Sequence, residues 1–337
     1  MKKHLIAVAV ASTLAAPVMA QNVTLSGRID ASVGRAVNSS DVTTTRVASG
    51  LLTTNQIVLQ ATEDLGGGLK ANFISASSFA SDDNATFDFG SRGTMVGLSG
   101  AFGSVAIGKS TGSMLNSTTT SGVTGNIGNL TLLSNTARPD NAVHYTTPNM
   151  SGVTLGLVYS AGASAQEANP KVEGFTEISG SFTAGALQIR AARAETKNVN
   201  QTYSASTSIF GTVSTAATVT DAKVTETGAD VNYNMGFARL NARIVTRDLD
   251  NSGNANNEFT DTGVGVAFPL GNGLTAIADY RDFNSKTDTS DYNVISLGLV
   301  KDLSKRTNAY AVYVARDNDT AADKKQSLLA IGLRHNF

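Results

Sequence analysis

The sequence predicts an all-β protein built as one closed antiparallel sheet of sixteen strands, a transmembrane β-barrel with an inward-folded third loop. Apolar and polar residues alternate with a period of two along most of the chain, as in strands that have two different faces. Glycine is abundant (32 residues) and proline is scarce (5), which suits strands joined by turns. Short and long connections also alternate, as in a barrel with its turns at one end and its loops at the other.

The first strand is expected within residues 23–33. Val23, Leu25 and Ile29 occupy one face of this segment, and Arg28 and Asp30 occupy the other. The same alternation returns in residues 153–159, 238–244 and 329–336. Each of these segments therefore has one apolar face and one polar face.

The connections give the number of strands. Seven tight turns are expected at residues 66–68, 101–103, 150–152, 185, 235–236, 271–273 and 303–305. Eight longer loops are expected at residues 37–54, 80–85, 110–140, 161–174, 198–222, 248–257, 284–290 and 317–325. Fifteen connections between two chain ends join sixteen strands.

A soluble all-β protein would also alternate, but two features favour a membrane barrel around a wet lumen. The polar faces are rich in Arg, Asn, Ser and Gly, as expected for a wall that faces water, and the mean hydropathy of the chain is correspondingly low, at −0.05. Aromatic residues gather near expected strand ends, as in an interfacial girdle: Phe73, Phe102, Tyr145, Tyr159, Phe237, Phe268, Tyr280, Tyr292 and Phe337. We find no second domain, so residues 21–337 form one barrel.

Residues 1–20 are predicted to be a cleaved signal peptide. Lys2 and Lys3 precede an apolar run over residues 5–18, and Val18-Met19-Ala20 gives a small-x-small cleavage site. The run is too short for a membrane-spanning helix, which needs about 20 apolar residues. The chain has no cysteine, so an exported protein of this kind is held together without disulfides.

Residues 110–140 form the longest of the expected loops. No charged residue occurs in it from Ser110 to Ala137. It combines Gly, Ser, Thr and Asn with a few apolar residues, among them Met114 and Leu115. Long loops are usually functional or disordered, and disordered segments are normally charged and poor in leucine. We therefore expect this loop to pack against something, namely the inside of the barrel.

With these features the sequence resembles the Gram-negative general diffusion porins, the trimeric sixteen-stranded family, and its β-proteobacterial branch in particular. The resemblance is carried, in the family's order, by residues 23–31 (VTLSGRIDA), 63–71 (EDLGGGLKA), 92–100 (RGTMVGLSG), 102–109 (FGSVAIGK), 138–145 (RPDNAVHY) and 331–337 (IGLRHNF). It implies a water-filled outer-membrane channel for small hydrophilic solutes and inorganic ions.

The resemblance further implies a homotrimer in contact with outer-membrane lipid and lipopolysaccharide. The third loop would form the narrowest point of each pore. The terminal Phe337 matches the signal that such barrels present to the barrel assembly machinery. No cofactor, no metal and no nucleic-acid partner are expected.

In this family a basic cluster on the barrel wall faces the third loop, and the matching residues here are Arg28, Arg92 and Arg138. Gln56 stands where the family commonly has another arginine. Asp30 is the nearest acidic residue expected to face the lumen. These residues predict a mild anion selectivity that grows as salt falls and does not titrate near neutral pH, because arginine stays charged.

Further arginines lie on expected lumen faces: Arg190, Arg239, Arg243, Arg247 and Arg281. One interpretation makes them solvated wall residues paired with nearby carboxylates, which the neighbouring Asp230 and Asp279 favour. The alternative is a basic track that guides anions to the narrow point.

A β-barrel could also have one of three other functions. An enzymatic barrel would need a nucleophile and a base in contact, but only His144 and His335 follow the signal, on different expected strands. A substrate-specific anion or small-solute channel remains an alternative, although no aromatic or lysine track marks one. A surface adhesin or receptor would use long loops such as residues 198–222, but the residues of this loop do not indicate a binding partner.

Overall fold

The computed structural model describes residues 22–38, 40–83, 87–114, 138–162, 174–204, 216–250, 257–286, 291–318 and 325–337. The strands are β1 (Asn22–Val37), β2 (Thr43–Ser49), β3 (Gln56–Gly66), β4 (Leu69–Ser78), β5 (Gly93–Gly100), β6 (Gly103–Lys109), β7 (Ala142–Thr146), β8 (Val153–Ser160), β9 (Gly174–Ala184), β10 (Leu187–Ser204), β11 (Ala216–Asn234), β12 (Arg239–Asp250), β13 (Asn257–Gly271), β14 (Leu274–Ser285), β15 (Tyr292–Asp302), β16 (Thr307–Asn318) and β17 (Gln326–Asn336). No helix in this part of the chain is long and apolar enough to cross a membrane.

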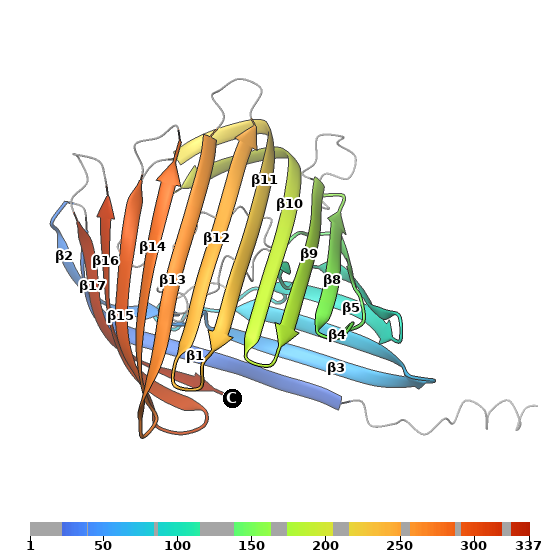
Figure 1. Cartoon of the computed structure of the whole chain (residues 1–337), viewed down its shortest axis with the longest axis horizontal. Helices are drawn as coiled ribbons and strands as arrows, with labels where there is room; N and C mark the ends of the chain where they lie inside the picture. Colours follow the sequence, from blue (N-terminus) through green and yellow to red (C-terminus); the bar gives the residue numbers. More distant parts are fainter. Residues whose placement is uncertain are drawn as a thin grey trace, which may run out of the picture.

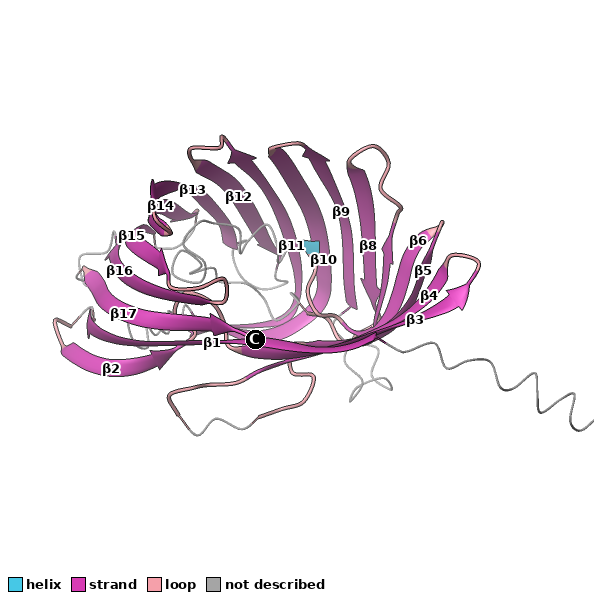
Figure 2. Ribbon diagram, turned by 90° about the horizontal axis from the view of Figure 1, so that it is seen from below, coloured by secondary structure: helices cyan, strands magenta, loops and turns pink. Residues whose placement is uncertain are grey.

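The sheet closes on itself through β1, which confirms the expected sixteen-stranded barrel. β1 pairs with β17 on one side and with β3 on the other, and every other pairing in the ring joins neighbours in sequence. β1 and β3 to β17 thus form a ring of sixteen antiparallel strands, seen from below in Figure 2 and from the side in Figure 1. Closure through β1 leaves the ring without a free edge, as a sheet in lipid requires, whereas β2 is paired with β1 alone among the described strands.

β2 corrects the expected loop over residues 37–54. It pairs with the outer half of β1, from Ala31↔Ser49 to Val37↔Thr43, directly beyond the stretch where β3 pairs with β1. β2 and β3 therefore occupy one barrel position in succession. The β-branched run from Thr43 to Val47 explains why this part of the expected loop is a strand.

The expected loop over residues 198–222 is also shorter than predicted. β10 continues to Ser204 and β11 begins at Ala216, so they are the longest of the described strands, with 18 and 19 residues, and their paired ends bend sideways at the top of the barrel (Figure 1). The Ser/Thr content suggested a loop, but threonine and valine, which recur through this stretch, also favour strands. Residues 1–21 and 115–137 lie outside the described residues, so the signal peptide and the inward fold of the third loop remain predictions.

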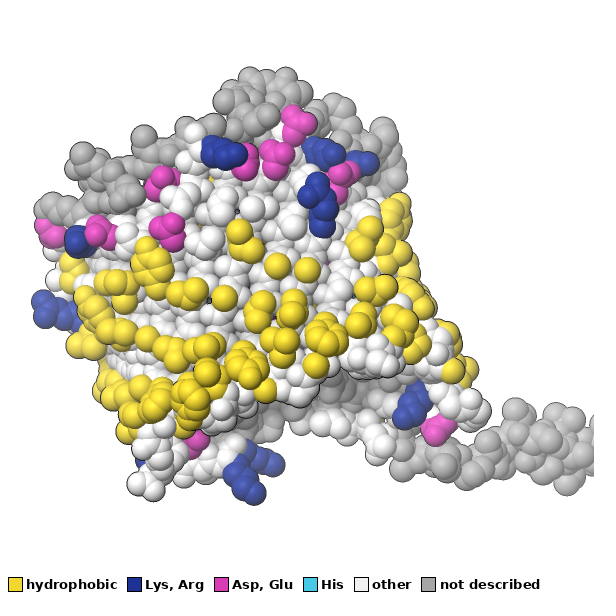
Figure 3. All heavy atoms as spheres, viewed as in Figure 1, with side chains coloured by type: hydrophobic (Ala, Val, Ile, Leu, Met, Phe, Trp, Pro, Cys, Tyr) yellow, Lys and Arg dark blue, Asp and Glu magenta, His cyan; other side chains and the backbone are white. Residues whose placement is uncertain are grey.

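The two faces of the wall carry opposite kinds of side chain. Leu25, Ile178 and Ile331 point outward and are 60–67% exposed, whereas Asp30 and Glu177 point inward and are fully buried. Figure 3 shows the outward residues as a hydrophobic belt, with charged side chains gathered above it. A soluble protein would bury this belt, and a barrel in a bilayer presents it to lipid.

Candidate functional site

The three arginines that were predicted from the sequence to face the third loop lie near one another on one side of the barrel interior. Arg28 lies on the inner face of β1, opposite Gln56 in the register with β3, and its Nε donates to the Thr54 carbonyl at 2.8 Å. Arg92 ends the turn before β5, where its backbone N–H donates to Ala76 O at 2.9 Å. Arg138 lies in the segment before β7. We call Arg28, Arg92 and Arg138 the basic cluster.

Electrostatics links the members of the basic cluster. Burial, and then the positive charges of Arg138 and Arg28, lower the pKa of Arg92 to about 10. Burial likewise lowers the pKa of Arg138, and its buried Nε makes no hydrogen bond within the described part of the chain. The cluster is therefore positively charged at neutral pH. Because its three members share one positive field, the cluster is suited to attract small anions.

Arg334 is a further basic residue beside the cluster, and sequence reasoning did not single it out. It lies on β17 opposite Asp30 and acts electrostatically on Arg28. Its Nε and an Nη donate to Asn308 Oδ1 at 3.0 and 2.7 Å. The available signal was its place on the polar face of the last strand, two residues before Asn336, which pairs with Arg28.

Asp30 corrects the expectation of a carboxylate facing lumen water. It lies on the inner face of β1, but it is fully buried. Its carboxylate accepts the backbone N–H groups of Leu52 and Thr53 at 2.8 and 2.6 Å and the Tyr310 hydroxyl at 2.5 Å. The cause is the chain between β2 and β3, which covers Asp30 and which the sequence pattern did not reveal.

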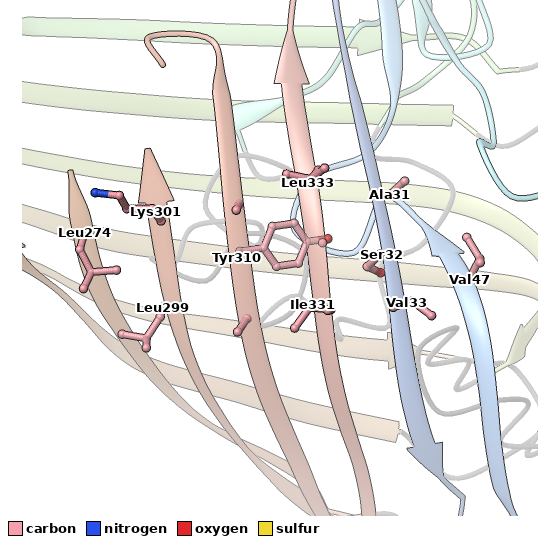
Figure 4. Close-up of a pocket in the computed structure, with 13 residues that line it drawn as sticks. Ala31, Ser32, Val33, Val47, Leu274, Leu299, Lys301, Tyr310, Ile331 and Leu333 are labelled. Carbon is pink, nitrogen blue, oxygen red and sulfur yellow. The ribbon is translucent and has the colours of Figure 1, made fainter. Parts of the chain in front are cut away.

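Tyr310 reaches Asp30 by crossing an intervening strand. It lies on β16 opposite Gly332 of β17, which in turn neighbours β1 (Figure 4). A Cβ at Gly332 would collide with the Tyr310 ring and hydroxyl. Gly332 therefore leaves the space through which β16 and β1 are joined by a hydrogen bond across β17.

The described start of the third loop turns toward the inside of the barrel. Ser110 donates its N–H to Pro139 O at 2.9 Å, which joins the two ends of the loop. Met114 donates its N–H to Glu177 Oε1 at 2.9 Å, and Glu177 is fully buried on the inner face of β9. Gly93, next to Arg92, leaves room for Ser110, because a Cβ there would collide with the Ser110 carbonyl.

The inner faces of β10 to β14, here called the charged wall, hold most of the other predicted arginines. Arg190 pairs with Asp230 at 2.8 and 2.9 Å, Arg247 pairs with Glu226 at 2.9 and 2.6 Å, and Arg281 pairs with Asp261. Arg243 crosses over Gly263 and lies in the field of Asp230, Asp261 and Asp279. Arg239 lies exposed at the end of β12.

These contacts favour carboxylate pairing over a continuous basic track. The sequence interpretation placed the pairs in solvent, whereas the side chains of Arg247, Glu226, Arg281 and Asp261 are at most 7% exposed. Two charges so buried stabilise the barrel only as a pair, because each is costly without its partner.

The inner faces of β15 to β17 and of the outer half of β1, here called the apolar wall, were not predicted. Val294, Val312, Val314 and Leu328 point inward and are at most 5% exposed. Leu51 and Leu52, from the chain between β2 and β3, belong to the same apolar cluster. The sequence signal was the apolar run over residues 328–331, which occupies both faces of the last strand.

An aromatic stack continues the apolar wall toward the charged wall. The rings of Phe259 and Phe283 lie 5.4 Å apart, and those of Phe283 and Tyr292 lie 4.8 Å apart. The Arg316 guanidinium lies 3.9 Å from the centre of the Tyr292 ring, which is a cation–π contact. Each residue comes from a different strand, so the stack ties β13 to β16 together.

Phe337 closes the barrel where the two chain ends meet. Its N–H donates to Gly27 O at 3.0 Å, and its carbonyl accepts the N–H of Gly27 at 2.9 Å. Its ring occupies the space beside Gly27, where a Cβ would collide with it. The described residues contain no cluster of three metal-ligating side chains, and His144 and His335 lie on β7 and β17.

Comparison with known proteins agrees with this geometry. Residues 7–321 match the family model described as Gram-negative porin. The chain is 29% identical to outer membrane porin protein 32 of Delftia acidovorans and 27% identical to major outer membrane protein P.IB of Neisseria gonorrhoeae, over the whole length of each pair.

Two solved structures share the fold. The anion-selective porin from Comamonas acidovorans superposes with a TM-score of 0.74 at 23% identity, over 94% of this chain and 100% of that one. The trimer form of OmpT, an outer membrane protein of Vibrio cholerae, superposes with a TM-score of 0.71 at 16% identity, over the same shares of the two chains. At these identities the likeness concerns the fold.

Proposed function

The chain belongs to the Gram-negative porin family, and we propose that its pore is a general diffusion channel with a mild preference for anions, set by the basic cluster. As a porin it forms a channel in the outer membrane. The observation that carries the preference is the shared positive field of Arg28, Arg92 and Arg138. The solved porin of Comamonas acidovorans is described as anion-selective, which supports the same direction.

The size of the preference follows from Coulomb's law. One unit charge about 10 Å from an ion in water contributes about 0.4 kcal/mol, so three arginines contribute about 1.2 kcal/mol. Screening at 0.1 M salt, with a Debye length of about 10 Å, reduces this roughly threefold. The remaining energy, about 0.4 kcal/mol, corresponds to about a twofold enrichment of anions near the cluster. Arg334 adds to the field, and Asp30 offsets it.

The solutes are small hydrophilic molecules and inorganic ions, and passage is passive rather than catalytic. The charged wall supports this proposal because its arginines are paired with carboxylates, so it does not form a chain of single binding sites. A channel specific for one anion would present a track of unpaired cations along the wall.

The proposal includes processing and assembly. Residues 1–20 are removed as a signal peptide, Phe337 is recognised by the barrel assembly machinery, and the mature barrel forms a homotrimer among lipid and lipopolysaccharide. The trimer form of the Vibrio cholerae protein supports the oligomeric state. A hollow of about 710 Å³ beside β17 and β1, lined by outward residues such as Ala31, Val33 and Ile331 (Figure 4), offers apolar surface to lipid or to another copy.

The test is conductance and solute flux of the purified protein. We expect stable ionic currents in planar bilayers, and a liposome-swelling rate that falls smoothly as the solute becomes larger. The reversal potential in a KCl gradient should have the sign of chloride preference and grow as salt is diluted. An absence of conductance would refute the channel, and cation preference would refute the role of the basic cluster.

A further inference from the structure

The chain between β2 and β3 contains more residues than the barrel wall needs. Arg28 of β1 pairs with Gln56, and Ala31 pairs with Ser49. Two residues of β1, Ile29 and Asp30, therefore face six residues on the other side, 50–55. Two residues there would continue β2 directly into β3 in register. We call residues 50–55 the inward segment.

The inward segment leaves the wall on its inner side. Leu51 and Leu52 are 3% and 4% exposed, and they pack in one cluster with the inward-facing Val294, Val312 and Leu328. Outward neighbours on the same strands, such as Leu297 and Leu329, are 49% and 59% exposed. The two leucines can bury themselves among inward residues only if the segment lies inside the barrel.

Hydrogen bonds hold the inward segment at both of its ends. Asp30 accepts the N–H groups of Leu52 and Thr53, and Gly50 donates its N–H to the Asp30 carbonyl at 2.8 Å. Asn55 Oδ1 accepts the Asp30 N–H at 2.6 Å, and Asn55 Nδ2 donates to Ser49 Oγ at 2.9 Å. A buried carboxylate with several donors is a strong anchor. The segment is therefore a fixed part of the interior.

The segment also positions a member of the basic cluster. The Thr54 carbonyl accepts a hydrogen bond from Arg28 Nε at 2.8 Å, and this bond fixes the orientation of the Arg28 guanidinium. Thr53 and Thr54 are half-buried, unlike the buried Leu51, Leu52 and Asn55 on either side of them. Among these five residues the two threonines keep the most exposed surface, and Thr54 contacts Arg28, while the Thr53 hydroxyl also donates to Asp30 Oδ2 at 3.5 Å.

We propose that the inward segment is a second pore-narrowing element, distinct from the third loop, and that Thr53 and Thr54 line the path of small hydrophilic anions beside Arg28. The proposal rests on the proposed channel function. Its chemistry is uncharged and hydroxyl-bearing, so it limits the size of the solute while Arg28 supplies the charge. The apolar wall then has a mechanical role, because it holds the segment in place through Leu51 and Leu52.

The absence of cysteine from the chain allows a direct test. In Thr54→Cys, a methanethiosulfonate reagent that carries a sulfonate group adds bulk and one negative charge at this position. We expect single-channel conductance to fall in steps, up to three for a trimer. For a charge about 10 Å from the ion path, the anion-to-cation permeability ratio should fall about 1.7-fold at 0.1 M salt and about 2.7-fold at 0.01 M, because the charge disfavours anions and favours cations by the same energy.

The matched control is Ser40→Cys in the exposed turn between β1 and β2. Mass spectrometry verifies that the reagent has modified each variant. Modification of Ser40→Cys should leave conductance and permeability ratio unchanged, because this turn lies beyond the barrel wall. If modified Thr54→Cys conducts like its unmodified form, the inward segment does not line the path and the proposal is wrong. If the unmodified protein does not conduct, it is the channel function that fails.

A second variant tests narrowing without adding any group. Replacing residues 50–55 by two residues should let β2 run into β3, remove the segment from the lumen and raise both the conductance and the size limit in liposome swelling. Circular dichroism and the gel mobility of unheated samples check that the barrel forms. A folded variant with unchanged conductance and size limit would overturn the proposal, and Thr54→Cys provides the answer if the variant does not fold.

Discussion

The charged wall and the apolar wall belong to one barrel and have the same period of two, yet they are held together in different ways. On the charged wall, buried arginines are matched by carboxylates on neighbouring strands, as in Arg247 with Glu226. On the apolar wall, valines and leucines pack against the inward segment through Leu52. Alternation thus fixes which residues point inward, but it does not decide whether the inside of a wall is wet, paired or packed.

The largest expected effect comes from breaking a pair on the charged wall. Arg247→Met leaves the buried carboxylate of Glu226 without its guanidinium, and removing one partner of a buried pair costs about 3–5 kcal/mol. Urea unfolding in lipid vesicles, followed by far-ultraviolet circular dichroism, measures the loss.

Two controls sharpen this prediction. Replacing both partners, Arg247→Met with Glu226→Leu, should restore most of the stability, because no buried charge then remains. Lys286→Met breaks the exposed pair with Glu258, whose side chains are 69% and 41% exposed, and should cost under about 1 kcal/mol. Equal losses in Arg247→Met and Lys286→Met would show that burial of the pair does not matter.

The apolar wall should respond to lost volume instead. Leu52→Ala removes a nearly buried side chain from the apolar cluster. We expect a loss of about 2–3 kcal/mol, the lower part of the range for such truncations, because a short connection can shift toward the space left behind. The same unfolding assay applies, with the lipid-facing Leu329→Ala as control. Leu329→Ala loses the transfer of its side chain into lipid but leaves no cavity, so an equal loss in the two variants would show that Leu52→Ala opens no cavity inside the barrel.

A smaller effect is expected where the apolar wall meets β1. In Gly332→Ala the added methyl group displaces the Tyr310 ring from its hydrogen bond with Asp30. The expected cost is about 1.5 kcal/mol, the lower end for a hydrogen bond to a charged group, because Leu52 and Thr53 still donate to Asp30. Tyr310→Phe in the Gly332→Ala background separates the causes: a second loss of equal size would show that the hydrogen bond had survived.

The smallest effect is a dependence of selectivity on pH. The pKa of Arg92 is lowered to about 10, so its positive charge is complete below about pH 9 and is lost as the pH rises through 10. The anion-to-cation permeability ratio should therefore be constant from pH 5 to pH 8 and fall about 1.7-fold above pH 10, as one of three charges disappears. Reversal potentials across this range measure it, and a transition near neutral pH would point to a different titrating group.

The two walls also show which features of the structure can be predicted from the sequence and which cannot. Sixteen strands, their faces and the inward side of Arg28 follow from local alternation and from the spacing of turns. The burial of Asp30 and the part played by Arg334 do not, because each depends on a partner far along the chain: Leu52 for Asp30 and Arg28 for Arg334. Side chains that cross a glycine to reach the second strand, such as Tyr310, escape pattern reasoning for the same reason. The strand β2 was missed for another reason: its signal is a short local stretch of threonine and valine inside an expected loop.

The most direct test of the account compares the reversal potentials of Arg92→Gln and Arg193→Gln with that of the original protein, in a KCl gradient at low salt. Both variants remove one positive charge, but Arg92 belongs to the basic cluster, whereas Arg193 lies exposed on the outer face of β10. The account predicts a reduced chloride preference in Arg92→Gln and an unchanged chloride preference in Arg193→Gln. Equal shifts in the two variants, or no shift in Arg92→Gln, would contradict a selectivity set by the basic cluster.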